Sequence, residues 1–296
     1  MSEWFPVNVG LREGYVMSPW LCNVYMDGMV REVNVMEFGN GLELLSADGG
    51  SFEINQLLFA DDTALVADSE DKLCRQLSEF GRVCERRKLK VNVGKSKVMR
   101  CSGYGNGGRM QSILNSEPLE EVDCFKNLGS QLAADGGCER DVVHRMNEGY
   151  RAWGAQKSVL SNRGLGIKAK KRLYEGVIVP MALNGAAAWG VRSAERRKVN
   201  VLETKCLRSL VGVSRMDRVR NEEVHRRPGI ERELATRADQ RALRWFAHVE
   251  RMDEYRMARR VLMAEVSGGR VRGTPRLDWM DGVKVGHGEQ RNDGGG

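Results

Sequence analysis

The chain has 296 residues, of which 41% are hydrophobic and 29% charged, so it can bury a core and is not expected to be disordered throughout. No stretch approaches the roughly 20 consecutive apolar residues that span a bilayer, and residues 1–10 lack the basic-then-apolar layout of a secretory signal. These features argue against an integral membrane protein and against export. Seven cysteines without a C-x-x-C pair, and four isolated histidines, predict neither a disulfide framework nor a zinc site, which suits a reducing compartment.

Charge is divided unevenly along the chain. Residues 1–130 carry 14 Lys and Arg against 19 Asp and Glu, a net charge of −5, whereas the remaining residues carry 33 against 21, a net charge of +12. A basic second half is typical of a protein that binds a polyanion such as nucleic acid, but a solvated helical surface has the same composition. Charge alone leaves both interpretations open.

The first predicted element is a helix that follows a loop around Gly10 and Gly14. Ser18 as N-cap and Pro19 at the first helical position are typical of a helix start, so a helix is predicted from about Pro19 to Val33. Its apolar stripe recurs at helical spacing: Leu21, Val24, Tyr25 and Met29. Residues 39–51 are rich in glycine and are predicted to form turns.

The sequence QLLFADDTALVAD predicts a β-hairpin, because the apolar runs Leu57–Ala60 and Ala64–Ala67 flank Asp61 and Asp62 at its tip. A helix is expected from Ser69 to Lys88, and its apolar face is formed by Leu73, Leu77, Phe80 and Cys84. Further short elements complete this part: a strand with a turn at Gly94, a flexible loop at residues 102–109, and strands near Leu119–Val122 and Cys124–Leu128.

From about Asp141 onward the pattern is helical. Candidate helices span residues 139–161, 167–189, 194–211, 219–226 and 231–249. Three tryptophans at helical positions are expected to belong to the core: Trp153, Trp189 and Trp245. The tail from Gly268 is rich in Gly and Arg and is predicted to be disordered at its end. Three domains follow: residues 1–130, a helical basic region at 131–267, and a flexible tail at 268–296.

Adjacent carboxylates are unusual at a hairpin tip, where two-residue loops favour Asn-Gly or Asp-Gly. A hard divalent cation relieves such like charges, and Mg²⁺ binds one or two carboxylates together with phosphate oxygens. A pair of Mg²⁺ ions about 3.5–4 Å apart can activate a 3′-hydroxyl and stabilise a leaving pyrophosphate. An isolated Asp-Asp pair is more commonly an exposed acidic turn without metal. The neighbouring motifs therefore decide between a metal site and such a turn.

Four motifs occur together in this chain. F-A-D-D occupies residues 59–62, GLREGYVMSPWLCNVY occupies residues 10–25, Lys95 lies in N-V-G-K-S at residues 92–96, and CFKNLGS occupies residues 124–130. In this order and at these spacings they resemble the catalytic hairpin, the G-[LV]-R-Q-G loop and following helix, the lysine-bearing motif and the primer grip of reverse transcriptases. The resemblance covers residues 3–130 and is strongest to the reverse transcriptases of non-LTR retrotransposons.

The resemblance implies an α+β fold: a partial polymerase palm, an antiparallel sheet with helices, followed by a mostly α-helical thumb-like region. It implies RNA-directed DNA polymerase activity by two-metal nucleotidyl transfer, with Mg²⁺ as cofactor and an RNA template and a DNA primer as partners. The implied site residues are Asp61 and Asp62 as metal ligands, Arg12, Glu13, Gly14, Phe59, Ala60 and Lys95 near nucleotide and template, and Leu128 and Gly129 in the primer grip.

The sequence also departs from the family pattern. Glu13 stands for the usual Gln, and Asn127 for the Tyr of the primer-grip motif. In the family a third metal-binding aspartate lies on a strand before the G-L-R-Q-G loop, and the fingers precede that strand. In this chain the resemblance begins already at Glu3–Phe5. The strand and the fingers are therefore expected to be missing. A truncated chain of this kind is predicted not to polymerise DNA, because positioning supplies most of phosphoryl-transfer catalysis. Its hairpin is predicted to present an unpaired apolar edge.

Two other hypotheses stay open. The basic helices would make a non-catalytic module that binds nucleic acid, or the chain would be a non-functional transposon relic. A nucleic-acid partner favours an intracellular location in the nucleus.

Overall fold

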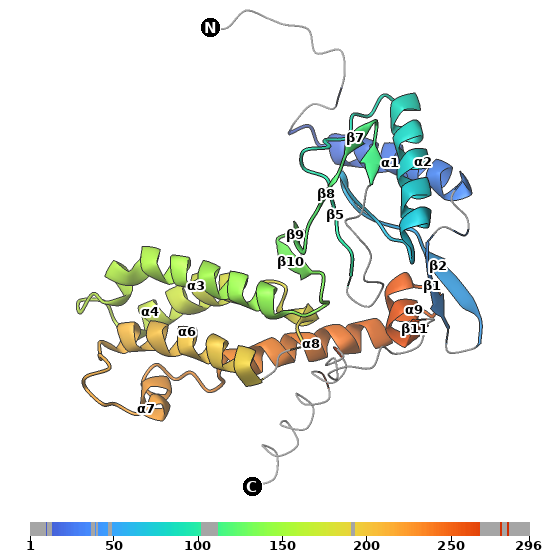
Figure 1. The fold of residues 1–296 in the computed structure, drawn as a ribbon. Coiled ribbons are helices and arrows are strands. Elements are labelled where there is room, and N and C mark those ends of the chain that lie inside the picture. Colours follow the sequence, from blue (N-terminus) through green and yellow to red (C-terminus); the bar gives the residue numbers. More distant parts are fainter. Residues whose placement is uncertain are drawn as a thin grey trace, which may run out of the picture. The chain divides into compact units, whose positions relative to one another are not determined.

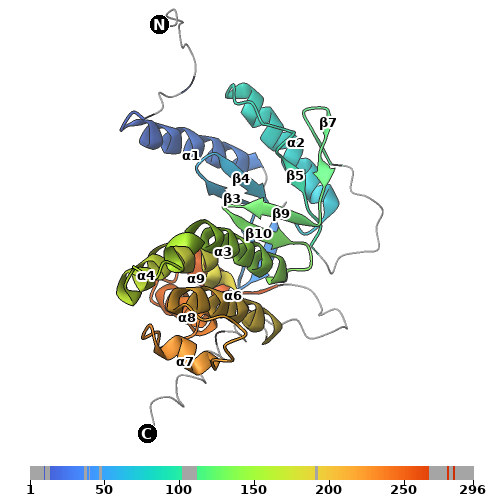
Figure 2. The same ribbon diagram turned by 90° about the vertical axis from the view of Figure 1, so that its left-hand side faces the viewer.

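The computed structural model describes residues 10, 14–36, 39, 41–46, 49–101, 112–190, 193–266, 279 and 283 of the chain. Two compact units are present: the first comprises residues 1–98, 105–122 and 260–270, and the second residues 99–104, 123–259 and 271–296. Helices and small, mostly antiparallel sheets give a mixed architecture that is compatible with the α+β class (Figures 1 and 2). None of the helices within these described residues combines the length and apolar character that a bilayer crossing requires.

Two helices of the first unit pack against each other. The first, α1 (Ser18–Met36), begins at the predicted Ser-Pro pair, where proline's missing N–H is no loss because first-turn N–H groups have no partner within the helix. The second, α2 (Glu70–Arg86), begins after Ser69 with two acidic residues, which the positive N-terminal end of a helix favours. Their shared core consists of Met29, Val33, Phe80, Val83 and Cys84. Both predicted helices are confirmed.

The predicted apolar stripe of α1 is buried only toward its C-terminal end. Met29 is 1% exposed, whereas Leu21 is 49% exposed and Val24 is 71% exposed. Tyr25 is also exposed, although its hydroxyl donates to the backbone oxygen of Arg87. The spacing located the apolar positions correctly, but periodicity does not say which part of the fold covers a face.

A three-stranded antiparallel sheet occupies the part of the first unit that was expected to form turns only. β1 (Leu42–Leu45) pairs with β2 (Ser51–Ile54) on one side and with β11 (Glu265–Val266) on the other. The prediction of turns for residues 39–51 was therefore wrong over β1. Each strand spans at most four residues, too few to produce a clear alternation, and the partner β11 lies more than 200 residues away in the sequence.

Short strands complete the first unit. β5 (Lys97–Val98) pairs in parallel with β8 (Glu120–Glu121), and β6 (Ile113–Leu114) pairs antiparallel with β7 (Glu117–Pro118). A second small core joins them to α2 through Leu77, Val98, Leu114 and Leu119. The strand predicted near residues 119–122 is confirmed, and the loop predicted at residues 102–109 lies outside the described residues.

The second unit opens with a hairpin of β9 (Cys124–Asn127) and β10 (Ser130–Ala133) and is otherwise helical. Its helices are α3 (Glu139–Leu160), α4 (Ile167–Leu173), α5 (Val179–Ala182), α6 (Ser193–Val211), α7 (Asn221–Arg226), α8 (Leu234–Glu250) and α9 (Met257–Met263), which ends in the first unit. One large apolar core lies between α3, α6, α8 and the segments from α4 to α5. The helices predicted at 139–161, 194–211, 219–226 and 231–249 are confirmed, and α9 was not foreseen.

The helix predicted for residues 167–189 is interrupted. After α4 the chain passes through a π-helical turn (Tyr174–Ile178), in which Val179 N–H donates to the oxygen of Tyr174, five residues back. Pro180 follows directly; it has no N–H to give and its ring would meet the carbonyl of residue 176 in a regular helix. The helix ends at Ala182, and only a 3₁₀ turn (Ala186–Ala188) continues it. Of the tryptophans expected in the core, Trp189 is 3% exposed and Trp153 partly buried, but Trp245 is 44% exposed and was predicted wrongly.

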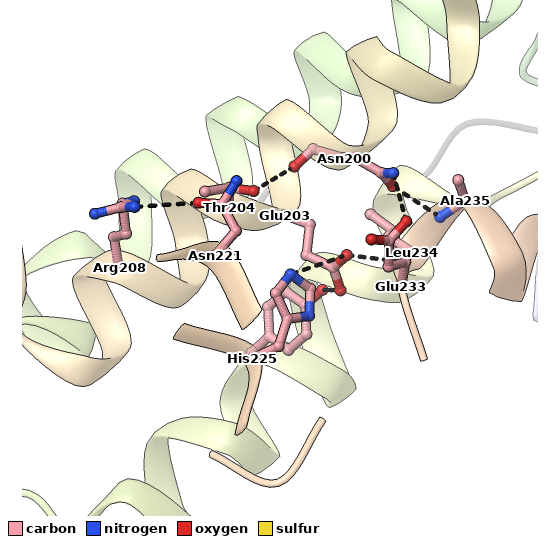
Figure 3. A network of polar contacts seen from close by, with 10 residues as sticks. Asn200, Glu203, Thr204, Arg208, Asn221, His225, Glu233, Leu234 and Ala235 are labelled. Atoms are coloured by element: carbon pink, nitrogen blue, oxygen red, sulfur yellow. Dashed lines mark hydrogen bonds and ion pairs between the residues drawn. The ribbon is translucent and has the colours of Figure 1, made fainter. Parts of the chain in front are cut away.

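A buried carboxylate joins three elements of the second unit. Glu203 of α6 is fully buried, and its two oxygens accept hydrogen bonds from the Tyr174 hydroxyl (3.0 Å) and from the Leu234 N–H at the start of α8 (2.7 Å). Asn200, one turn earlier, accepts from the next N–H, that of Ala235 (3.3 Å; Figure 3). Side chains of α6 thereby satisfy N–H groups of α8 that have no partner within their own helix.

Candidate functional site

The hairpin that carries the two aspartates is built as the sequence predicted. β3 (Gln56–Phe59) and β4 (Asp62–Leu65) are antiparallel with Phe59 opposite Asp62, which leaves Ala60 and Asp61 as a two-residue loop. Asp61 lies in the loop and Asp62 is the first residue of β4. Ala60 has a φ of +53°, a conformation that two-residue hairpin loops usually give to Gly or Asn.

The base of this hairpin is anchored and its tip is exposed. Asn55 O accepts the Val66 N–H (2.8 Å), and the buried Gln76 of α2 donates from Nε2 to the oxygen of Val66 (3.0 Å). At the other end Phe59 is 63% exposed, and Ala60, Asp61 and Asp62 are exposed as well. The structure therefore holds the strands from below and presents both carboxylates to solvent.

Both carboxylates are available to a cation. Within the described residues neither Asp61 nor Asp62 forms an ion pair with a basic side chain, and no group of three or more Asp, Glu, His or Cys residues converges as a metal site. Mg²⁺ is commonly bound by one or two carboxylates, with waters and phosphate oxygens completing its shell. Two carboxylates fit a Mg²⁺ site in which the substrate's phosphate oxygens supply further ligands. They are too few to form a Mg²⁺ site from protein ligands alone.

The edge of the hairpin is open in the described part of the chain, where β3 and β4 pair only with each other. Leu57 and Phe59 of β3 are 56% and 63% exposed. An open edge with apolar side chains is the arrangement that natural sheets usually cover, because it offers unpaired backbone groups to another strand. Within the described residues, no further strand pairs with the edges of this hairpin.

Two other predicted site residues belong to the first unit. Gly14 lies exposed in the turn before α1 with a φ of +76°, which suits glycine. Lys95 is exposed in a turn before β5, where its N–H donates to Oδ1 of Asn92 (3.2 Å) and its side chain stays in solvent. Arg12 and Glu13 lie outside the described residues.

The predicted primer-grip residues form a tight turn in the second unit. Leu128 (φ +48°) and Gly129 (φ +83°) are the two loop residues between β9 and β10, and two positive φ values are typical of the type I′ loop. The oxygen of Gly129 accepts from the guanidinium of Arg145, and the N–H of Gln131 donates to Oδ1 of Asp141 (2.8 Å). Two side chains of α3 thus fix this turn.

Sequence reasoning missed Asp141 and Arg145. Both are buried, at 5% and 7% exposure, and Asp141 also accepts from the indole of Trp189 (2.7 Å). A charged residue in the first turn of a helix is ordinarily a surface residue, so the sequence carried no signal that this one holds a hairpin turn.

Comparisons with known proteins agree with these features. Residues 1–132 match the model of the reverse transcriptase (RNA-dependent DNA polymerase) family, a segment that contains the Asp61–Asp62 hairpin and all but the last residue of the β9–β10 hairpin. An uncharacterized transposon-derived protein of Caenorhabditis elegans is 24% identical over 209 residues, which cover 69% of this chain and 74% of that protein. Reverse transcriptases act on nucleic acids and use divalent metal ions. Residues 1–132 are therefore similar to the reverse transcriptase family, and the chain is similar to a transposon-derived protein.

Proposed function

We propose that Asp61 and Asp62 are the metal-ligating carboxylates of a polymerase palm and would hold Mg²⁺ at the primer end during RNA-directed DNA synthesis. The observation that carries this proposal is the anchored hairpin with two exposed, unpaired carboxylates at its tip, inside the segment that matches the reverse transcriptase family. When bound, Mg²⁺ would lower the pKa of the primer hydroxyl and neutralise the charge of the leaving pyrophosphate.

The other predicted residues would position the substrates. Phe59 and Ala60 would contact the primer end from the hairpin itself, and Lys95, whose exposed side chain can reach outward, would face the triphosphate as a charge partner. We propose that Arg12, Glu13 and Gly14 lie near nucleotide and template. Leu128 and Gly129 would support the primer backbone through their fixed turn.

We further propose that these 296 residues do not extend a primer on their own. Two carboxylates lie at the hairpin tip, and the described residues contain no group of three or more acidic, His or Cys side chains that could hold a metal ion. A two-metal mechanism depends on fixed positions for both ions, and looser geometry removes most of the rate, since positioning and electrostatics supply the catalysis.

Mg²⁺ binding and primer extension test the two parts of the proposal separately. Isothermal titration with Mg²⁺ in the presence of a primer–template and a nucleoside triphosphate is expected to give a protein-dependent signal, measured above that of the same substrates without protein, that is lost in D61N/D62N. The control D253N/E254Q removes another pair of adjacent exposed acids and is expected to leave it unchanged. Equal titration signals from the two variants would contradict the assignment of Asp61 and Asp62 as metal ligands. Primer extension by the unmodified chain that is lost when Asp61 is replaced would overturn the proposed inactivity.

A second candidate function is nucleic-acid binding without chemistry. The charge of +12 on residues 131–296 favours it. Such binding is expected to be independent of sequence, to weaken steeply with salt and to survive Asp61→Ala. An absence of binding at low salt would exclude this function.

A further inference from the structure

One end of the helical second unit gathers basic side chains from two separate segments, which we call the basic end: residues 163–172 and 208–220. The first segment has five Lys and Arg and no Asp or Glu, and the second has four against one. They meet where Lys170 Nζ donates to the oxygen of Leu210 (3.4 Å). Figure 1 shows the loop before α4, the C-terminal end of α6 and the loop before α7 at the same end of this unit.

Most of these charges face solvent without a counter-ion. The exposed members of the basic end are Arg163, Lys168, Arg172, Arg215, Arg218 and Arg220. In the described ranges of the chain no acidic side chain forms an ion pair with any of the six. By contrast, Arg226 at the end of the neighbouring α7 and Arg227 directly after it are both paired with Glu223. The basic end therefore combines a high density of charge with free donors.

The loop that carries half of these charges is held in a fixed conformation. Arg208 donates to the backbone oxygens of Ser214 (3.0 Å) and Val219 (2.7 Å), which closes the loop on the end of α6. At the two ends of this loop, Val213 and Val219 pack against the apolar core. A loop that is already ordered loses little conformational entropy when it binds a partner.

The single acidic residue of this loop shapes the turn, and the three arginines Arg215, Arg218 and Arg220 leave the loop with a net positive charge. Asp217 accepts hydrogen bonds from the Ser214 N–H (2.6 Å) and the Ser214 hydroxyl (2.9 Å), and these bonds lower its pKa. Its carboxylate is thus used in shaping the turn, while Arg215 and Arg218 on either side remain free.

An apolar side chain stands among these charges. Met216 lies between Arg215 and Asp217 and is 90% exposed, more than any other large hydrophobic residue in the described chain. Neighbouring Arg218 has a φ of +51°, an unfavourable conformation for arginine that the fixed loop maintains. A flexible thioether beside guanidinium groups suits contact with a sugar or base while the arginines contact phosphates.

We propose that the basic end binds the phosphate backbone of a nucleic acid, with Arg215, Arg218 and Arg220 on phosphates and Met216 against a sugar or base. The choice of nucleic acid over other polyanions rests on the proposed function. The presence of the charged surface does not depend on that function. Contacts of this kind position a strand or duplex and carry no base sequence.

Fluorescence anisotropy tests the proposal with the full chain, a labelled RNA–DNA duplex and EDTA in place of Mg²⁺. R215A/R218A/R220A is expected to weaken binding at least about tenfold at low salt and to reduce the slope of log K against log salt by about 2–3. The control R244A/R251A/R256A removes three exposed arginines of the same unit and is expected to change binding less than about twofold. Met216→Ala is expected to weaken binding about threefold with an unchanged salt slope.

Equal losses in the two triple variants would overturn the proposal, since binding would then follow net charge and no particular surface. Binding to vesicles of anionic lipid without binding to the duplex would assign the basic end to a membrane surface and would equally overturn it. Because the assay contains EDTA, it does not depend on metal binding by Asp61 and Asp62, so failure of the metal assignment leaves this test intact. Circular dichroism of each variant establishes that the helices are retained.

Discussion

The indole N–H of Trp189 donates to Oδ2 of Asp141 at 2.7 Å, and this pair connects the end of one helical segment to the start of α3. The other oxygen of Asp141 accepts the N–H of Gln131 at 2.8 Å. Arg145 lies one turn further along α3, with its Nε 3.9 Å from the same carboxylate. One buried acid therefore holds a helix, a hairpin and a tryptophan together.

We expect Asp141→Asn to destabilise the second unit by about 1–3 kcal/mol, although it keeps the shape of the side chain. The amide has only one acceptor oxygen, so the N–H of either Trp189 or Gln131 meets an NH₂ group. Asp141→Ala, which also leaves buried Arg145 without its counter-ion, is expected to cost about 3–5 kcal/mol. Urea unfolding followed by circular dichroism measures both.

Glu148→Gln provides the control, because Glu148 lies on the same helix and pairs with the exposed Arg151. Its cost is expected to stay within about 1 kcal/mol. A cost for Asp141→Asn no larger than that of the control would show that Asp141 does not hold the hairpin to the helix.

The pH dependence of stability is expected to depend on Glu203. Burial raises the pKa of this carboxyl above its ordinary value. The Leu234 N–H and His225 (Figure 3), together with the Tyr174 hydroxyl and Arg237, lower it. The folded state then binds the proton more tightly than the unfolded state. The contribution of Glu203 is therefore greatest below its unfolded pKa near 4.5 and is lost as pH rises through its raised folded value.

Glu203→Gln removes this titration, since the neutral amide can accept from Leu234 and donate to the Tyr174 oxygen. The free energy of unfolding of the variant, minus that of the parent, is expected to increase as pH rises above about 4.5. Glu222→Gln, at an exposed glutamate of α7, is expected to show no such trend. A difference that falls with rising pH would mean that the folded protein prefers the ionised Glu203.

Periodicity and capping signals predicted most helices of this chain, because they depend on residues within a few turns of each other. The start of α1 at Ser18-Pro19 and the buried face of α2 at Leu77 and Phe80 are of this kind. The pairing of β1 with β11 depends on residues far apart in the sequence, and so does the exposure of Val24. Neither could be obtained from a local pattern.

The candidate site shows the same division. The hairpin of Asp61 and Asp62 was predictable because a strand–turn–strand pattern is local, and its loop shifted by only one residue. The residues that support the second hairpin could not be predicted. Asp141 and Trp189 are 48 residues apart in sequence, and no local pattern around either one indicates their contact. The π-helical turn before Pro180 was not predicted either, because a proline in a helical pattern is equally compatible with a kink in the helix and with its end.

The turn of the β9–β10 hairpin is expected to become more stable when Leu128 is replaced by Asn. Leu128 has a φ of +48° and is 55% exposed, so it has the cost of a left-handed conformation without gaining full burial. Asparagine tolerates this conformation, and Leu128→Asn is expected to stabilise the protein by about 0.5–1 kcal/mol in urea unfolding.

Two further variants mark the limits of that effect. Leu132→Asn, the same replacement at a strand position with 46% exposure, is expected to destabilise, because asparagine is a poor strand residue. Gly129→Ala is also expected to destabilise, since φ is +83° and the new Cβ would lie 3.2 Å from Nη2 of Arg145. Destabilisation by Leu128→Asn would instead show that the leucine side chain itself supports the turn.

The cysteines are expected to differ widely in reactivity. Burial raises the pKa of the Cys84 thiol to about 11 and that of Cys206 to about 12, whereas Cys101 is exposed. Since the thiolate is the reactive form, iodoacetamide at pH 8 is expected to alkylate Cys101 first and to leave Cys84 and Cys206 unmodified in the folded protein. Peptide mass spectrometry over a time course measures each site, and denaturant is expected to equalise the rates. Alkylation of Cys206 as fast as Cys101 without denaturant would mean that the core between α3 and α6 opens readily, in conflict with the full burial of this thiol.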